Sequence, residues 1–212
     1  MKKKNSRNTK SKIVSAAWKL FYEQGYEDTT IEDIIFESET SKGSFYHYFS
    51  GKDALLSSLS YLFDDKYEQL YPEIDDSENS FDVLIYLNHE VFRMIEDTVP
   101  IELLAMMYSS QLITKSEKHL LDHTRTYYKL LRKIVSNGIE KGELIDTESV
   151  NDIVKAYAMC ERSLLYDWCI CNGEYSLSDY SAKMLPRFLQ SYKINKKGNQ
   201  SNEKSRKSKG II

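Results

Sequence analysis

Residues 41–49, SKGSFYHYF, bring together side chains that could contact another molecule. Side chains three and four positions apart share one face of a helix. On one face, a helix over this stretch would carry three aromatic residues, Phe45, Tyr48 and Phe49. On the other, it would carry residues that suit a surface, Lys42, Gly43, Ser44, Tyr46 and His47. The spacing therefore predicts an aromatic face that packs inward and a polar face that stays exposed.

The polar face has the chemistry of a surface that binds duplex DNA. The ammonium of Lys42 can bind guanine O6 and N7 or a phosphate. Tyr46 and His47 can donate hydrogen bonds to phosphate oxygens or contact a thymine methyl group. Gly43 costs about 1 kcal/mol of helix propensity relative to Ala, and its missing side chain would let another surface approach. Two alternatives stay open: an ordinary solvated helix face, or a helical module whose Lys42, Tyr46 and His47 bind a protein partner.

Other residues whose spacing could do chemistry form no complete site. His119 and His123 lie four positions apart, but HLLDH lacks the Glu of a zinc-protease motif, and only Asp122 could join them as a ligand. Cys169 and Cys171 have no further Cys or His nearby. The sequence shows no Gly-rich phosphate loop and no GxSxG motif. We therefore expect no catalytic residue, no metal site and no cofactor, and we expect free thiols in a reducing cytoplasm.

Helices must position these side chains. Three Pro and eight Gly in 212 residues leave long uninterrupted stretches, which argues against an all-β chain. Apolar residues at helical spacing predict a first helix over about 10–24. Thr30, with Asp33 three residues later, resembles a capping box for a second helix over 31–37, and Ser41 can cap a third. Two short helices joined by four polar residues and supported by a longer one form a helix-turn-helix unit.

The rest of the chain predicts a larger helical domain, so the fold class is all-α. Further helices are expected over 52–71, 81–97, 101–112, 116–142, 147–173 and 176–193, with a kink at Pro186 in the last. The predicted organisation is a disordered basic arm (1–9), a DNA-binding domain (10–50), a helical regulatory and dimerisation domain (51–192) and a disordered basic tail (193–212).

Charge is distributed unevenly along the chain, whose net charge is −3. Residues 1–12 hold six basic residues and no acid, and residues 193–212 hold seven basic residues and one acid. Residues 13–192 hold 16 basic and 31 acidic residues. An acidic body with basic ends could present cations to DNA although the total charge alone argues against nucleic acid. No stretch approaches 18 apolar residues, so we expect no membrane span.

The segment TTIEDII…TSKGSFYHYFSGKDALL, residues 29–56, resembles the N-terminal helix-turn-helix of the TetR family of bacterial transcriptional regulators. The preceding AAWKLFYEQGYEDTT is similar to the family's entry pattern, and the resemblance covers about residues 10–56. Two positions depart from it. Glu39 stands where the family usually has a Gly that supplies a positive φ, and Ile35 replaces a small Ala. A non-Gly residue in that backbone conformation costs roughly 1 kcal/mol.

The resemblance implies roles for individual residues. Thr30 would cap the second helix and bind a phosphate, and Lys52 would bind a phosphate at the start of the fourth helix. The major-groove face would comprise Lys42, Gly43, Ser44, Tyr46 and His47. The basic arm could add minor-groove or backbone contacts. The resemblance also implies a repressor that binds a palindromic operator as a homodimer, through helices of about 148–171 and 177–192.

The same resemblance implies a pocket for a small-molecule inducer among helices 81–97, 101–112 and 116–141. Adjacent Met106 and Met107 would give an adaptable apolar lining, so an apolar or aromatic ligand is expected. The candidate ligand-binding residues are His89, Met106, Met107, Tyr108, Gln111 and Tyr127. For each of them singly, ordinary core packing is the competing interpretation.

Overall fold

The computed structural model describes the backbone of residues 2–56, 58–75, 77–113 and 118–194, with side chains from residue 9 onward. Helices are its only regular elements in those ranges. The first part comprises α1 (Lys2–Gln24), α2 (Ile31–Glu37), α3 (Lys42–Tyr48) and α4 (Lys52–Leu56). The second comprises α5 (Leu59–Leu70), η1 (Tyr71–Glu73), α6 (Ser80–Thr98), α7 (Ile101–Ile113), η2 (His119–Leu121), α8 (Thr126–Glu140), α9 (Val150–Ile170), α10 (Leu177–Phe188) and η3 (Gln190–Tyr192). The all-α fold class is confirmed.

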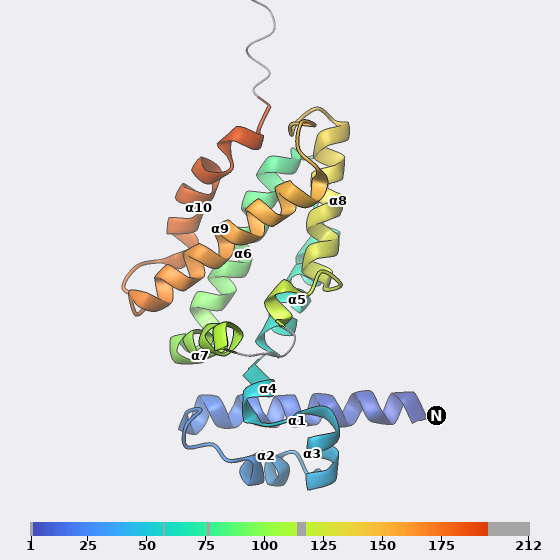
Figure 1. Ribbon diagram of the computed structural model, residues 1–212, viewed down its shortest axis with the longest axis vertical. Helices are drawn as coiled ribbons and strands as arrows, with labels where there is room; N and C mark the ends of the chain where they lie inside the picture. Colours follow the sequence, from blue (N-terminus) through green and yellow to red (C-terminus); the bar gives the residue numbers. More distant parts are fainter. Residues whose placement is uncertain (1, 57, 76, 114–117, 195–212) are drawn as a thin grey trace, which may run out of the picture.

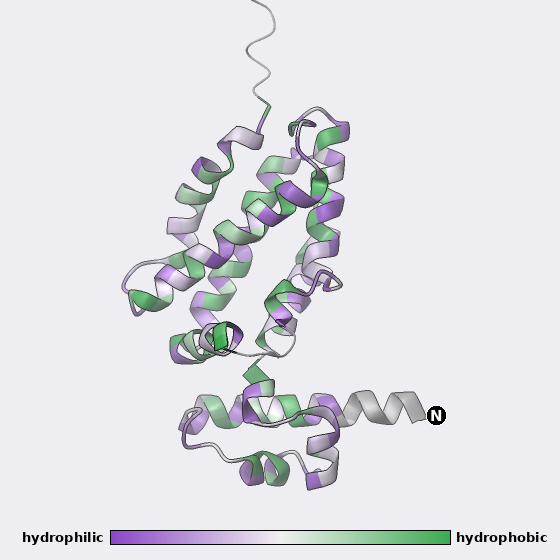
Figure 2. Ribbon diagram, in the orientation of Figure 1, coloured by the Kyte–Doolittle hydropathy of each residue, from purple (hydrophilic) through white to green (hydrophobic). Residues whose placement is uncertain are grey.

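The chain forms a small head and a larger body. The head consists of α1, α2 and α3, and α4 leads from it to the helices of the body (Figure 1). In the body, α6 packs against α10 and α8, and α9 packs against the same two helices and α7. Apolar and polar residues alternate along the body helices, as helices with one buried face require (Figure 2). None of the helices described is long and apolar enough to cross a membrane.

Local signals account for the helix-turn-helix. Thr30 caps α2, its hydroxyl accepting from the Asp33 amide while the Asp33 carboxylate accepts from the Thr30 amide. Ser41 caps α3 by accepting from the Ser44 amide at 3.1 Å. Both predicted caps are therefore confirmed. Glu39 adopts φ 51°, so the turn keeps the left-handed residue that the family supplies with Gly, and its side chain is exposed.

The expected single helix over 52–71 is wrong, because the chain breaks between α4 and α5. The Ser58 hydroxyl donates to the Leu55 carbonyl at 2.5 Å and accepts from the indole Nε1 of Trp18 at 2.7 Å. A serine side chain that bonds the backbone three residues earlier competes with the helical ladder. The break thus coincides with a hydrogen bond between the head and the start of the body.

The expected long helix over 116–142 is also too long, because α8 begins only at Thr126. Asp122 accepts hydrogen bonds from the amide and hydroxyl of Thr124 at 2.8 and 2.6 Å, which closes a turn ahead of the helix. His119 therefore lies in η2 and His123 in that turn, not on one helix. No cluster of metal-ligating side chains occurs among the residues described.

The chain ends differ in part from expectation. Helix α1 begins at Lys2, so residues 2–9 belong to a helix rather than to a disordered arm. Residues 2–9 contain no Gly or Pro, so their sequence does not prevent the helix predicted from residue 10 from extending toward the N-terminus. Ser149, not Thr147, caps α9, and Pro186 lies in the last turn of α10. The predicted disorder of the tail concerns residues 195–212, which lie outside the described part of the chain.

Candidate nucleic-acid interface and internal cavity

The two faces predicted for residues 41–49 are separated in the structure. Phe45 and Phe49 are buried, with 0% and 6% of their surface exposed, and Tyr48 is half-buried. Helix α3 packs against α1 and α2 through this side. The side chains of Lys42, Tyr46 and His47 are exposed on the opposite side, with Gly43 beside them and Ser44 half-buried. The structure therefore brings the five predicted major-groove residues together on one surface.

Gly43 has no internal packing reason to be a glycine. Apart from its chain neighbours and the backbone of its own helix, the nearest atom to a Cβ placed there would be the Ser41 Oγ at 3.9 Å, and the backbone is ordinary helix. The chain thus accepts about 1 kcal/mol of lost helix propensity without an internal gain. An outside surface that approaches α3 closely would explain the residue.

Lys42 is not free on this surface. Its ammonium donates to a carboxylate oxygen of Glu32, on α2, at 3.1 Å, and both side chains are exposed. The hydrogen bond from Lys42 lowers the pKa of Glu32, and the Glu32 carboxylate raises the pKa of Lys42. DNA would have to compete with Glu32, which sequence reasoning did not single out.

The Lys52 side chain forms hydrogen bonds to the backbone within the head. Its ammonium donates to the carbonyls of Tyr26, Thr29 and Glu27 at 2.6, 2.9 and 3.3 Å, and lies 4.2 Å from the centre of the Tyr26 ring. These bonds fix the segment that leads into the cap of α2. The predicted phosphate contact of Lys52 remains a prediction, since all three ammonium protons already have acceptors.

Thr30 is similarly engaged. Its hydroxyl donates to the Asp33 carboxylate at 2.6 Å and accepts from the Asp33 amide at 3.1 Å. The hydrogen bonds from Thr30 lower the pKa of Asp33. A phosphate contact from Thr30, which also remains a prediction, would have to displace Asp33 or share the hydroxyl with it.

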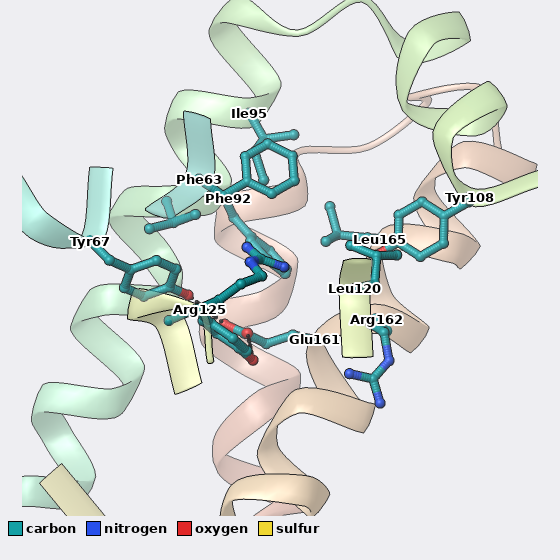
Figure 3. Close-up of a pocket in the computed structure, with 12 residues that line it drawn as sticks. Phe63, Tyr67, Phe92, Ile95, Tyr108, Leu120, Arg125, Glu161, Arg162 and Leu165 are labelled. Atoms are coloured by element: carbon teal, nitrogen blue, oxygen red, sulfur yellow. Dashed lines mark hydrogen bonds between the residues drawn. The ribbon is translucent and has the colours of Figure 1, made fainter. Parts of the chain in front are cut away.

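The body contains a cavity of about 50 Å³ between five of its helices and the η2 segment (Figure 3). Its walls are largely apolar or aromatic, with three charged residues among them. The lining residues are Phe63, Tyr67, Val91, Phe92, Ile95, Tyr108, Leu120, Arg125, Tyr127, Glu161, Arg162 and Leu165.

Two of the six predicted ligand-binding residues, Tyr108 and Tyr127, line this cavity; the others do not. Met107 is buried in the core, and Met106 is half-buried against it. The Gln111 side-chain oxygen accepts from the Leu120 amide at 3.4 Å. The His89 ring lies 3.1 Å from a carboxylate oxygen of Glu90. These four roles remain predictions without support from the cavity.

Glu161 is the most unusual residue of the cavity wall. It is 5% exposed, and its carboxylate accepts hydrogen bonds from the hydroxyls of Tyr127 and Tyr67 at 2.5 and 3.2 Å and from the Asn88 side-chain amide at 2.8 Å. Burial raises the pKa of Glu161, and the hydrogen bonds partly offset that rise. The network joins α5, α6, α8 and α9.

Arg125 and Asp64 form a second buried group. The Arg125 Nε and Nη2 atoms each lie 2.9 Å from a carboxylate oxygen of Asp64, and Nη2 also donates to the Ser60 carbonyl at 2.8 Å. Both side chains are more than 90% buried. This two-pronged pair ties the start of α8 to α5.

Comparison with known proteins decides the family. The family model described as bacterial regulatory proteins of the tetR family matches residues 13–59. YvdT of Bacillus subtilis, an uncharacterized HTH-type transcriptional regulator, is 30% identical over 141 residues, 66% of this chain and 71% of YvdT. The chain belongs to the TetR family of bacterial transcriptional regulators. A Lactococcus lactis regulator encoded in the lacX 3′ region is 50% identical over 56 residues, 26% of this chain and 29% of the relative.

The fold of this TetR-family chain also matches solved structures over most of its length. FadR of Thermus thermophilus, a TetR-family repressor in complex with lauroyl-CoA, is 20% identical with a TM-score of 0.70, covering 89% of this chain and 97% of that one. FadR of Bacillus subtilis, in complex with stearoyl-CoA, is 20% identical with a TM-score of 0.64, covering 85% and 98%. At these identities the likeness establishes the fold.

Sequence reasoning missed Glu161, although a signal was present. Tyr157, Glu161 and Leu165 follow at four-residue intervals, so the acid lies on the apolar stripe of α9. An acidic residue on such a stripe is rarely buried without a function or a network. Arg125 and Asp64, 61 residues apart, offered no comparable local signal.

Proposed function

We propose that this TetR-family protein is a ligand-responsive repressor that binds a palindromic operator as a homodimer and is released from it by a small-molecule inducer. The observation that carries the DNA-binding part is the outer face of α3. Lys42, Tyr46 and His47 are exposed there around a glycine that packing does not require, while Phe45 fixes the helix from behind. A short, rigidly seated helix with such a face suits the major groove.

The test is operator binding by a double variant. Lys42→Ala with Tyr46→Ala should weaken binding to palindromic duplexes from the neighbouring genomic region by at least tenfold, as measured by fluorescence anisotropy at low salt. Wild-type binding should also fall steeply as salt rises, because phosphate contacts release counterions. Lys129→Ala together with Tyr86→Ala, two exposed positions of the body outside α9 and α10, is the matched control.

Two results would contradict this proposal. Wild-type protein that binds none of these duplexes at low salt would leave the exposed face of α3 without a DNA function. Unchanged affinity in the double variant would leave that face to another partner, such as a protein. Thermal melting must confirm that the double variant is folded, which its two exposed positions favour.

The homodimer is supported by exposed apolar side chains on the last two helices. Met159, Tyr166 and Ile170 follow one face of α9 and are 54%, 50% and 64% exposed. Tyr180 and Phe188 on α10 are 39% and 47% exposed. A second copy that packs α9 and α10 against their counterparts would cover these side chains.

Replacing two of these residues should separate the copies. Ile170→Glu with Phe188→Glu should yield monomers in sedimentation equilibrium, because unpaired charges would be buried in the contact. The same protein should lose most of its operator affinity, since one head contacts only one half-site. Tyr22→Glu, at an aromatic residue of the head that is 74% exposed, is the control. A double variant that stays dimeric would place the contact elsewhere.

The inducer part rests on the cavity between α5, α6, α7, α8 and α9. The two FadR proteins, which share the fold of this chain, form complexes with lauroyl-CoA and stearoyl-CoA. A compound that raises the melting temperature of this protein should also lower its affinity for the operator. Stabilising compounds that leave operator affinity unchanged would argue against an inducer that acts from this cavity.

A further inference from the structure

The cavity wall contains a buried acid without a counter-charge. Among the residues described, no Lys, Arg or His approaches the Glu161 carboxylate within ion-pair distance. Its hydrogen-bond donors, two tyrosine hydroxyls and the Asn88 amide, are all neutral. A buried carboxylate in such a setting is costly in its ionised form unless a cation joins it.

The two arginines of the cavity wall do not supply that cation. The Arg125 guanidinium is neutralised by the two-pronged contact with Asp64. Arg162 is half-buried, and its Nη1 atom donates to the Tyr128 hydroxyl at 3.3 Å. Figure 3 shows the Arg162 side chain directed away from the Glu161 carboxylate. Among the described wall residues, Glu161 is therefore the deeply buried charged group without an ion-pair partner, whereas the cation of Arg162 is partly exposed to solvent.

Behind Glu161, the buried polar network includes an acceptor without a partner. The amide of Asn88 is fully buried and donates its N–H to Glu161, while its oxygen has no partner in the described structure. Buried polar atoms without a partner are uncommon, and each calls for an explanation such as a bound group. Asn88 does not itself line the cavity, so this oxygen belongs to the buried polar network behind Glu161 and is not by itself a ligand contact.

Aromatic rings complete the environment. Phe63 and Tyr67 come from α5, Phe92 from α6, Tyr108 from α7 and Tyr127 from α8, and all five line the cavity with Glu161 (Figure 3). The faces of such rings attract cations, most strongly where water is excluded. An acid surrounded by aromatic rings suits a ligand that has a positively charged end group and an otherwise apolar structure.

From the buried carboxylate without an ion-pair partner and the aromatic walls, we infer that the cavity binds a lipophilic amine in its ammonium form, with Glu161 as its counter-ion. This inference rests on the proposed function, since it names the class of inducer for the same cavity. It also departs from the acyl-CoA ligands of the two FadR proteins.

The test compares three compounds that share one scaffold and differ in charge. The cation is 2-phenylethylamine, the neutral isostere is propylbenzene and the anion is 3-phenylpropanoate. Calorimetric titration at neutral pH should show the cation binding at least tenfold more tightly than either of the others. Lauroyl-CoA is included as the rival ligand. Equal or better binding of the neutral compound, the anion or lauroyl-CoA would overturn the inference, as would no binding of any compound at millimolar concentration.

A variant of Glu161 tests whether its carboxylate is the group that recognises the cation. Glu161→Gln keeps the shape of the side chain, so it should remove the preference for the cation while leaving propylbenzene affinity within about twofold. Glu148→Gln, an exposed acid just before α9, is the matched control and should bind like the wild type. An unchanged cation preference in Glu161→Gln would refute the role of Glu161. If that variant does not fold, Tyr108→Leu on another wall replaces it, with a several-fold loss expected for the cation alone.

Operator binding, measured in parallel, separates this inference from the proposed function. If the amine binds through Glu161 but leaves operator affinity unchanged, the ligand class stands and the inducer role fails. If the protein binds no operator at all, the three-compound comparison still decides the ligand class. If operator binding responds only to lauroyl-CoA, the proposed function as a ligand-responsive regulator is supported and the inference of an amine ligand fails.

Discussion

At the scale of single residues, Glu161 shows that burial identifies a candidate site residue better than residue type does. The sequence presents it as one of 32 acidic residues, and nothing short of its position on an apolar helix stripe distinguishes it. The tyrosines that bond it come from positions 67 and 127, so the network could not be inferred from local spacing. The exposed face of α3 could be predicted, because it depends only on helical periodicity within nine residues.

Glu161 should make stability depend on pH. Its folded-state pKa lies above the unfolded value, because burial disfavours the charged form. Its contribution to stability is therefore fully present below the unfolded pKa and is lost as pH rises through the folded pKa. In urea unfolding, the stability of Glu161→Gln relative to wild type should increase as pH rises from about 4 to about 8. A difference that stays constant with pH would contradict the assignment.

Lys52 should prove a structural residue. Lys52→Ala removes a cation from three carbonyls, so we expect a loss of about 1–3 kcal/mol in the free energy of unfolding by urea. Lys42→Ala, at an exposed position, should change it by less than about 0.5 kcal/mol. Lys52→Ala with wild-type stability and weakened operator binding would instead establish the phosphate contact.

At the scale of elements, the caps of α2 and α3 could be predicted, but the break before α5 and the late start of α8 could not. Thr30 and Ser41 each act on backbone within three residues, so their signal is local. The break at Ser58 involves Trp18, 40 residues earlier, and α8 begins where Arg125 turns inward to Asp64. Local patterns do not contain partners that only the folded chain brings together.

The break before α5 should be sensitive to the Ser58 hydroxyl. Ser58→Ala leaves the indole N–H of the half-buried Trp18 without its acceptor, so we expect a loss of about 1 kcal/mol in stability, measured by thermal unfolding. Ser163→Ala removes an exposed hydroxyl that bonds only within α9, and should change stability little. Equal effects of the two substitutions would show that the hydrogen bond between head and body does not contribute to the stability of the protein.

At the scale of the whole molecule, the head and the body differ in the charge that they present to a polyanion such as DNA. Residues 13–192 are strongly acidic, whereas residues 1–12 carry six basic side chains. Phosphates would repel the body and attract the start of α1, which favours approach with the head forward. This distribution could be derived from the sequence, but its meaning depends on the separation of head and body in space (Figure 1).

The bond between Trp18 and Ser58 also has an optical consequence. The chain has two tryptophans, and Trp18 lies where the head meets the start of α5, while Trp168 donates to the Tyr175 carbonyl at the far end of α9. Indole emission depends on the polarity around the ring and on its hydrogen bond. After Trp168→Phe, the intrinsic fluorescence of the protein would come from this junction alone. The protein thus carries an unlabelled reporter of the junction between head and body, which the proposed inducer signal would have to cross to reach the DNA.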